Sequence, residues 1–185
     1  MVVTVLMSDV RGYSGIAERV DPTVLAGMLN GHRAEMNNAI LSEGGTVMQY
    51  VGDAVMAVFG APFPQEDHAD RALAAGCAML AGQDAVNERW RAEGLPEFGL
   101  GIGLSTGEVA AALLGSDERV EYTLVGDTVN LAQRLQDLAR PAGTIVLSGP
   151  TLDALTAPPS VDPLGEQHVK GREAPVQAYR LADTT

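Results

Sequence analysis

Two apolar runs around Gly52-Asp53 constrain the fold of this 185-residue chain most strongly. The runs, TVMQYV and AVMAVF, favour strands, and the two residues between them favour a tight turn. Residues 46–59 are therefore predicted to form a β-hairpin. A helical pattern stops at Gly44-Gly45 before the hairpin, and a proline-containing loop over 60–66 follows it, so the hairpin must join two long helices.

The elements around this hairpin predict an α+β fold. Residues 2–7 form a buried apolar run, and helices are expected over 14–42, with a break before Asp21-Pro22, and over 68–91. A further strand over 98–106 gives the order β-α-β-β-α-β. This is the ferredoxin-like split βαβ core (βαββαβ), in which helices pack on one face of an antiparallel sheet.

The C-terminal half is expected to add a β-hairpin arm and an αβ extension to that core. The strands of the arm alternate around Gly115-Ser116-Asp117, and residues 157–163 are interpreted as a loop. The length suits one domain over 1–185, without repeats or linkers. The added elements are, in chain order, the arm, a helix and two late strands: 109–125, 128–138, 144–148 and 176–181.

The formal charge of −12 and the isoelectric point of about 4.5 limit the partners of the chain. A surface this acidic does not attract nucleic acid or anionic lipid, so neither is expected as a partner. It also repels a polyanionic substrate, unless metal ions or local cations reverse the sign of the electrostatic potential at the site. Lys170 is the only lysine, so a role that needs an ammonium group has one candidate.

The expected location is the cytoplasm. The single cysteine, Cys77, excludes an internal disulfide framework and fits a reducing compartment. No apolar run reaches the length of about 18 residues that a membrane-spanning helix needs. The first residues, MVVTVLMSDV, lack the basic n-region of a signal peptide.

Asp9 and Asp53 are the first candidates for a functional site. Asp9 ends the first strand, and Asp53 lies in the hairpin between the second and third strands. In a βαββαβ sheet these strands are neighbours, so the two carboxylates can lie side by side. Two adjacent carboxylates repel each other unless they share a cation, and oxygen ligands of this kind suit Mg²⁺ or Mn²⁺. Each acid alone also fits a structural role, because Asp is common in turns and before helices.

The loop that follows Asp9 is typical of a phosphate-binding site. Gly12 lets the backbone turn and Ser14 opens a helix, so that backbone N–H groups from Gly12 through Tyr13 to Ser14 can surround a phosphate. A metal site beside a phosphate loop predicts a nucleoside triphosphate as ligand.

A second group of candidates lies in the segment EYTLVGDTVNLAQRLQDLAR, residues 121–140. A strand turns at Gly126-Asp127 into a helix, on which Asn130 and Arg134 share one face at i and i+4. An amide one turn from a guanidinium could clamp a sugar and a phosphate. Periodicity alone favours the simpler interpretation, in which these residues form a solvated helix face.

Five motifs occur along the chain: VTVLMSDVRGYS, GGTVMQYVGDAVMAVFGAP, GLGIGLSTGEV, EYTLVGDTVNLAQRL and VKGREAPVQAYRL. In this order they resemble the class III nucleotidyl cyclases, the family of adenylate and guanylate cyclase catalytic domains. The resemblance covers about residues 2–181. Each motif alone is a weak signal, whereas five in register are highly specific.

The resemblance implies roles for individual residues. Asp9 and Asp53 look like the two metal carboxylates, and Val10 looks like the residue whose backbone carbonyl also binds metal. Asn130 is similar to the amide that orients the ribose. Arg134 is similar to the cation that stabilises the reacting phosphate.

The resemblance also implies a reaction and an assembly. The ribose 3′-oxygen would attack the α-phosphorus and release pyrophosphate, assisted by two Mg²⁺ or Mn²⁺ ions per site. Lys170 looks like the lysine that contacts the triphosphate. In this family one protomer gives the metal acids and its partner gives the base-reading residues, the amide, the arginine and the lysine, so a homodimer has two composite sites. The 109–125 hairpin and the Asn130 helix would lie at that interface.

The base-reading positions depart from the family pattern. Gln49 stands where a lysine is usual, four residues before the second metal acid, and Thr123 stands at the partner position. An amide and a hydroxyl can each donate or accept, so the pair suits adenine, and with a flipped amide guanine or a pyrimidine. ATP is the first choice, because Thr occurs at the second position among adenylate cyclases. The alternative is GTP or a pyrimidine triphosphate.

Two rival functions fit parts of the same pattern. A cyclase-like module could bind nucleotide with little turnover, although all the implied metal and phosphate residues are present. A diguanylate cyclase shares the split βαβ core, but Gly44-Gly45 is followed by TVMQ and not by that family's GG(D/E)EF signature. A nucleotidyl cyclase of intracellular signalling is therefore the expectation.

Overall fold

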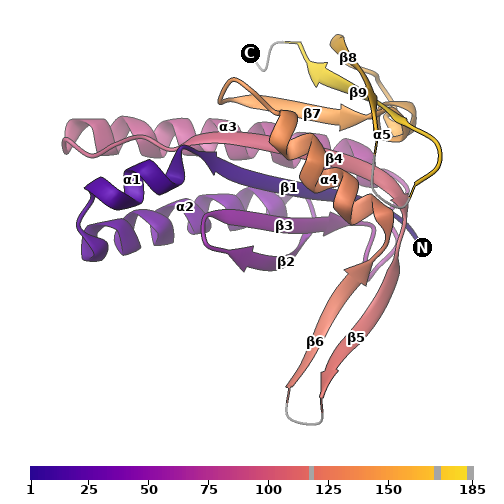
Figure 1. Ribbon diagram of the computed structural model, residues 1–185, viewed down its shortest axis with the longest axis horizontal. Coiled ribbons are helices and arrows are strands. Elements are labelled where there is room, and N and C mark those ends of the chain that lie inside the picture. Colours follow the sequence, from indigo (N-terminus) through magenta and orange to yellow (C-terminus); the bar gives the residue numbers. More distant parts are fainter. Residues whose placement is uncertain (117–118, 169–171, 183–185) are drawn as a thin grey trace.

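The computed structural model describes residues 1–116, 119–168 and 172–182, and its body is a seven-stranded sheet with helices packed against it (Figure 1). The strand order is β2-β3-β1-β4-β7-β9-β8. The strands of this sheet are β1 (Val2–Arg11), β2 (Thr46–Val51), β3 (Ala54–Phe59), β4 (Gly99–Glu108), β7 (Thr144–Ser148), β8 (Val161–Gln167) and β9 (Val176–Leu181). The helices are α1 (Tyr13–Arg19), α2 (Pro22–Ser42), α3 (His68–Ala92), α4 (Asp127–Leu138) and α5 (Gly149–Ala154).

The α+β class, the predicted hairpin and the βαββαβ core order are confirmed. β2 and β3 form the hairpin around Gly52-Asp53, and β1 lies between β3 and β4, antiparallel to both. Pairing of Ser8 with Val55 and of Asp9 with Gly101 fixes the register at the functional end of β1. The sheet is not antiparallel throughout, because β7 pairs with β4 in parallel.

The two core helices share one face of the sheet, as predicted, and the helix of the C-terminal extension lies on the other face. α2 and α3 cover one face, where Gly76 of α3 lies against Ile102 of β4. α4 lies on the opposite face, where the backbone of α4 passes directly over Gly103. Successive residues of a strand point to opposite faces, so β4 presents apolar side chains to α3 and glycines to α4.

Two short C-terminal elements were not predicted. β8 covers part of the segment expected to be a loop, and it tolerates Pro163 because it is an edge strand with a register shift between Pro163 and Gly165. α5 has six residues, too few for a periodic pattern. Its start is capped by the Ser148 hydroxyl, which accepts a hydrogen bond from the Thr151 N–H at 3.2 Å.

The predicted arm is a separate two-stranded sheet of β5 (Ala110–Ser116) and β6 (Arg119–Val125) that projects from the body (Figure 1). Leu113 of β5 pairs with Tyr122 of β6, and these side chains are 71% and 43% exposed. Apolar surface of this kind on a projecting hairpin suits contact with another protein surface. Among the described residues, no helix is both long and apolar enough to cross a membrane.

The packing of α4 on the sheet can be tested with two glycine substitutions. We expect Gly103→Ala to destabilise the domain by about 1–3 kcal/mol, because the added methyl group would meet the backbone of Ala132 and Gln136. Gly27→Ala is the control, since Gly27 is exposed on α2 with open space around it, and should stabilise by about 0.5–1 kcal/mol. Urea denaturation measures both. Equal stability of Gly103→Ala and the wild type would contradict this packing.

Candidate functional site

Asp9 and Asp53 lie together at one end of the sheet. Asp9 is near the end of β1, and Asp53 follows Gly52, whose positive φ of 59° shapes the β2–β3 turn. The Val10 N–H donates a hydrogen bond of 3.0 Å to Asp53 Oδ2, which fastens the turn to β1. The structure thus brings the two acids together as the sequence predicted, because β1 and β3 are adjacent strands.

The electrostatics of this pair favour a bound cation. The pKa of the Asp9 carboxyl is raised from 3.8 to about 7, first by burial, then by a side-chain hydrogen bond with Asp53 and by the charge of Asp53. The Val10 N–H and the positive charge of Arg11 oppose this rise. Two half-buried carboxylates that repel each other are an acceptable donor set for Mg²⁺ or Mn²⁺, which would remove the repulsion.

α2 supports the turn that carries Asp53, a contact that no sequence pattern indicated. The Arg33 guanidinium donates to the Gly52 carbonyl at 2.7 Å and lies 5.0 Å from the centre of the Tyr50 ring. The neighbouring His32 is fully buried and its Nδ1 is hydrogen-bonded to Gln83 at 2.7 Å. Burial lowers the pKa of His32, so the imidazole stays neutral near physiological pH. The turn that carries Asp53 therefore rests on α2, which is anchored to α3 through His32 and Gln83.

The predicted phosphate loop opens into the same pocket as the two acids. Gly12 has a φ of 69° and precedes α1, a conformation that favours glycine. The pocket has a volume of about 240 Å³, and its lining brings the acids, the loop and two arginines together: Asp9, Val10, Arg11, Gly12, Tyr13, Ser14, Asp53 and Arg140.

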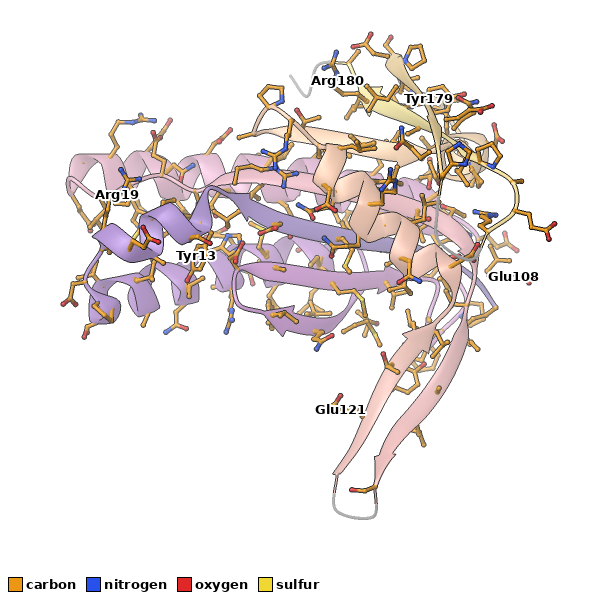
Figure 2. The ribbon with its side chains drawn as sticks, viewed as in Figure 1. Tyr13, Arg19, Glu108, Glu121, Tyr179 and Arg180 are labelled. Carbon is orange, nitrogen blue, oxygen red and sulfur yellow. The ribbon has the colours of Figure 1, made fainter. Side chains whose placement is uncertain are left out.

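Within this loop, Tyr13 contributes through its backbone. Its ring packs edge-on against Phe98, with the centroids 6.0 Å apart, and so belongs to the core (Figure 2 labels Tyr13). Ser14 is exposed at the start of α1. Arg11 and Arg140, which the sequence did not single out, bring positive charge to a pocket that also holds two acids.

Gln49 and Thr123 line a second pocket, of about 390 Å³, between β2 and the arm. Glu121 lines it as well, two residues before Thr123 on β6, and Figure 2 shows Glu121 on this strand. Period-two spacing along β6 could have indicated Glu121, because residues i and i+2 share a face. The other lining residues are Met48, Tyr50, Met56 and Tyr122. The two predicted base-reading residues are thus neighbours within one chain.

Asn130 and Arg134 are not brought to the acids within one chain. Both are exposed on α4, whose buried side, with Leu131 and Leu135, faces the sheet. Neither residue lines the pocket that holds Asp9. Lys170, the predicted triphosphate contact, lies outside the described residues.

Comparison with known proteins identifies the family. The family model described as "Adenylate and Guanylate cyclase catalytic domain" matches residues 1–183. The chain belongs to this family. Adenylate cyclase 1 of Rhizobium meliloti (strain 1021) is 33% identical to this cyclase-family domain over 180 residues, which are 97% of this chain and 27% of the relative. Adenylate cyclase of Anabaena cylindrica is 31% identical over 188 residues, 96% of this chain and 36% of the relative.

Solved structures similar to the cyclase-family domain include both kinds of cyclase. The guanylyl cyclase Cya2 matches with a TM-score of 0.91 and 34% identity, over 98% of this chain and 92% of that one. The adenylyl cyclase CyaB from P. aeruginosa matches with a TM-score of 0.92 and 34% identity, over 98% and 94%. A guanylyl cyclase domain from Blastocladiella emersonii, described as a non-canonical dimer, matches with a TM-score of 0.82 and 28% identity, over 97% and 95%. The cyclase-family domain spans about a third of the length of the curated relatives named above.

The repulsion between the two acids can be tested without activity. The folded state holds the Asp9 proton more tightly than the unfolded chain does, so this contribution to stability is present below pH 3.8 and is lost as the pH rises through about 7. At pH 8 without metal, Asp53→Asn should therefore raise the Tm by about 2–4 °C, the shift expected from about 1 kcal/mol in a domain of this size.

The same variant tests the metal. Mn²⁺ should raise the Tm of the wild type at pH 8, less so at pH 6 where protons compete for Asp9, and should not raise that of Asp53→Asn. Asp153→Asn, which removes an exposed acid from α5, is the control and should behave as the wild type. An equal response to Mn²⁺ in all three proteins would exclude this pair as the metal site.

Proposed function

We propose that the cyclase-family domain converts a nucleoside triphosphate, most readily ATP, to the 3′,5′-cyclic monophosphate and pyrophosphate. The observation that carries this proposal is the pocket in which Asp9, Asp53 and the Gly12 loop meet, in a chain of this family. The pocket combines ligands for a metal with backbone donors for a phosphate.

The donor set suits Mg²⁺ or Mn²⁺ bound together with the nucleotide. Among the described residues, no cluster of three or more His, Cys, Asp or Glu side chains could hold a metal ion. Asp9, Asp53 and the Val10 carbonyl would therefore share two ions with the substrate phosphates, as is usual for Mg²⁺. When bound, the ions would lower the pKa of the ribose 3′-hydroxyl and neutralise charge on the leaving pyrophosphate.

The protein's own residues would bind and orient the nucleotide. Backbone N–H groups of the loop from Gly12 to Ser14 would hold phosphate oxygens, and Lys170 would contact the triphosphate. Asn130 would orient the ribose for attack on the α-phosphorus. Arg134 would stabilise the charge that develops on the α-phosphoryl oxygens in the transition state.

We assign these residues to composite sites in a two-fold homodimer. The exposure of Asn130 and Arg134 on the outer side of α4 supports this arrangement, as does the apolar surface on the arm. In each site one protomer would supply Asp9 and Asp53, and its partner would supply the base-reading and α4 residues. Two-fold symmetry then gives two equivalent sites.

The choice of ATP depends on the pocket that Gln49 and Thr123 share. The Gln49 amide can accept from the adenine N6 amino group while it donates to N1. The similar structures do not decide between bases, because an adenylyl and a guanylyl cyclase match at the same 34% identity. An amide and a hydroxyl discriminate less sharply than a charged pair, so GTP is the second candidate.

Complementation between two inactive variants tests the composite site. Asp53→Ala removes a metal ligand, and Arg134→Ala should lower turnover by about 10²–10³-fold while fold and dimer remain intact. In an equal mixture about half of the dimers are mixed, each with one intact site, so activity should return to about a quarter of the wild-type value. Near-normal activity of Arg134→Ala alone would refute its role, and no recovery in the mixture would refute the composite site.

Base selectivity requires a separate measurement. Purified protein is incubated with Mn²⁺ and each of ATP, GTP, CTP and UTP, and the cyclic products are identified by mass spectrometry. We expect the highest kcat/KM for ATP, by about tenfold or less over GTP, since one amide contact is worth about 1.4 kcal/mol at most. Faster turnover of GTP or UTP than of ATP would refute the choice of base without refuting cyclase activity.

A further inference from the structure

Arg11 joins the end of β1 to the end of α4. Its Nε donates to the Ala139 carbonyl at 3.1 Å, and its Nη2 donates to the same oxygen at 2.9 Å and to the Gln136 carbonyl. These carbonyls lie at the C-terminal end of α4, where a helix leaves its last acceptors without the N–H groups of a following turn, although the Gln136 carbonyl also accepts from the Ala139 N–H at 3.0 Å. One side chain therefore caps a helix that is 116 or more residues away along the chain.

The surrounding residues are suited to this contact. The last turn of α4 has no basic residue of its own, so Arg11 supplies the positive charge that a helix C-terminus favours. Gly101, on the neighbouring strand β4, leaves the space for the guanidinium, because a Cβ there would overlap Arg11. The negative charges of Asp9 and Asp137 favour the charged guanidinium of Arg11, and the positive charge of Arg140 opposes it.

The two elements that Arg11 joins, β1 and α4, carry residues that the proposed function assigns to different sites. Asp9, a metal acid, lies two residues before Arg11 on the same side of β1. Arg134 lies two residues before Gln136 on α4, and Asn130 one turn earlier. In the proposed dimer these two groups serve different sites, so Arg11 connects one site to the other within a single chain.

We propose that Arg11 is a positioning residue that holds α4 in place, and with it Arg134 and Asn130, for the site whose metal acids the partner supplies. This inference rests on the proposed composite site. Loss of the contact frees the end of α4 to shift over the glycines of β4. A displacement of about 1 Å at a group that acts in the transition state can lower turnover by about 10²-fold.

The test places one substitution in either chain of a mixed dimer. Mixed dimers of one Asp53→Ala chain and one Arg134→Ala chain are purified through two different tags. The intact site of such a dimer takes its acids from the Arg134→Ala chain and its α4 residues from the Asp53→Ala chain. Arg11→Met is added to one chain or the other. We expect kcat to fall at least about fivefold further when it is in the Asp53→Ala chain. Arg19→Met, which removes an exposed arginine from α1, is the control (Figure 2).

The other outcomes are decisive as well. Equal losses in the two arrangements would show a general effect on fold or dimer, and a larger loss in the chain that supplies the acids would place Arg11 at the metal or triphosphate. Either result overturns the proposal. If Arg11→Met does not fold, Arg11→Lys in the same two arrangements gives the answer. Absence of activity in the parental mixed dimer would instead refute the composite site.

Discussion

The repulsion between Asp9 and Asp53 is the constraint on which the site depends. Adjacent strands place the two carboxylates together, and burial with mutual repulsion raises the pKa of Asp9 to about 7. Arg11 and Arg33 direct their hydrogen bonds to backbone carbonyls, since Arg11 donates to carbonyls of α4 and Arg33 donates to the Gly52 carbonyl. The repulsion between the two acids therefore costs stability, and a bound cation would remove this cost.

Glycines on β4 explain why helices cover both faces of the sheet. Gly99, Gly101, Gly103 and Gly107 share the face toward α4, and at each a Cβ would meet a neighbouring atom too closely. Their absence of side chains lets α4 and Arg11 approach the backbone of the strand. The alternation in GLGIGLSTG is visible in the sequence, and in a strand it indicates such an approach.

Local sequence patterns predicted several features of the structure, whereas contacts between segments far apart in the chain were harder to predict. The β2–β3 hairpin and the meeting of Asp9 with Asp53 followed from turn residues and from strand order. The position of α4 on the opposite face of the sheet did not follow from such patterns. The sequence of an amphipathic helix shows which side of the helix is buried, but not which face of a sheet buries it. The support of the Asp53 turn by Arg33 was missed for a related reason, since the two lie on separate elements.

In the proposed function, the charge of the chain would give the metal a second role. With a formal charge of −12, the protein repels a free nucleoside triphosphate, and this repulsion slows association at low ionic strength. A nucleotide that is already bound to its cation is less negative than the free nucleotide. The cation also brings positive charge that neutralises Asp9 and Asp53. Arg140 and Arg11 add positive charge at the same pocket. Metal and nucleotide should therefore bind with positive cooperativity, because each reduces the electrostatic cost of placing the other beside two acids.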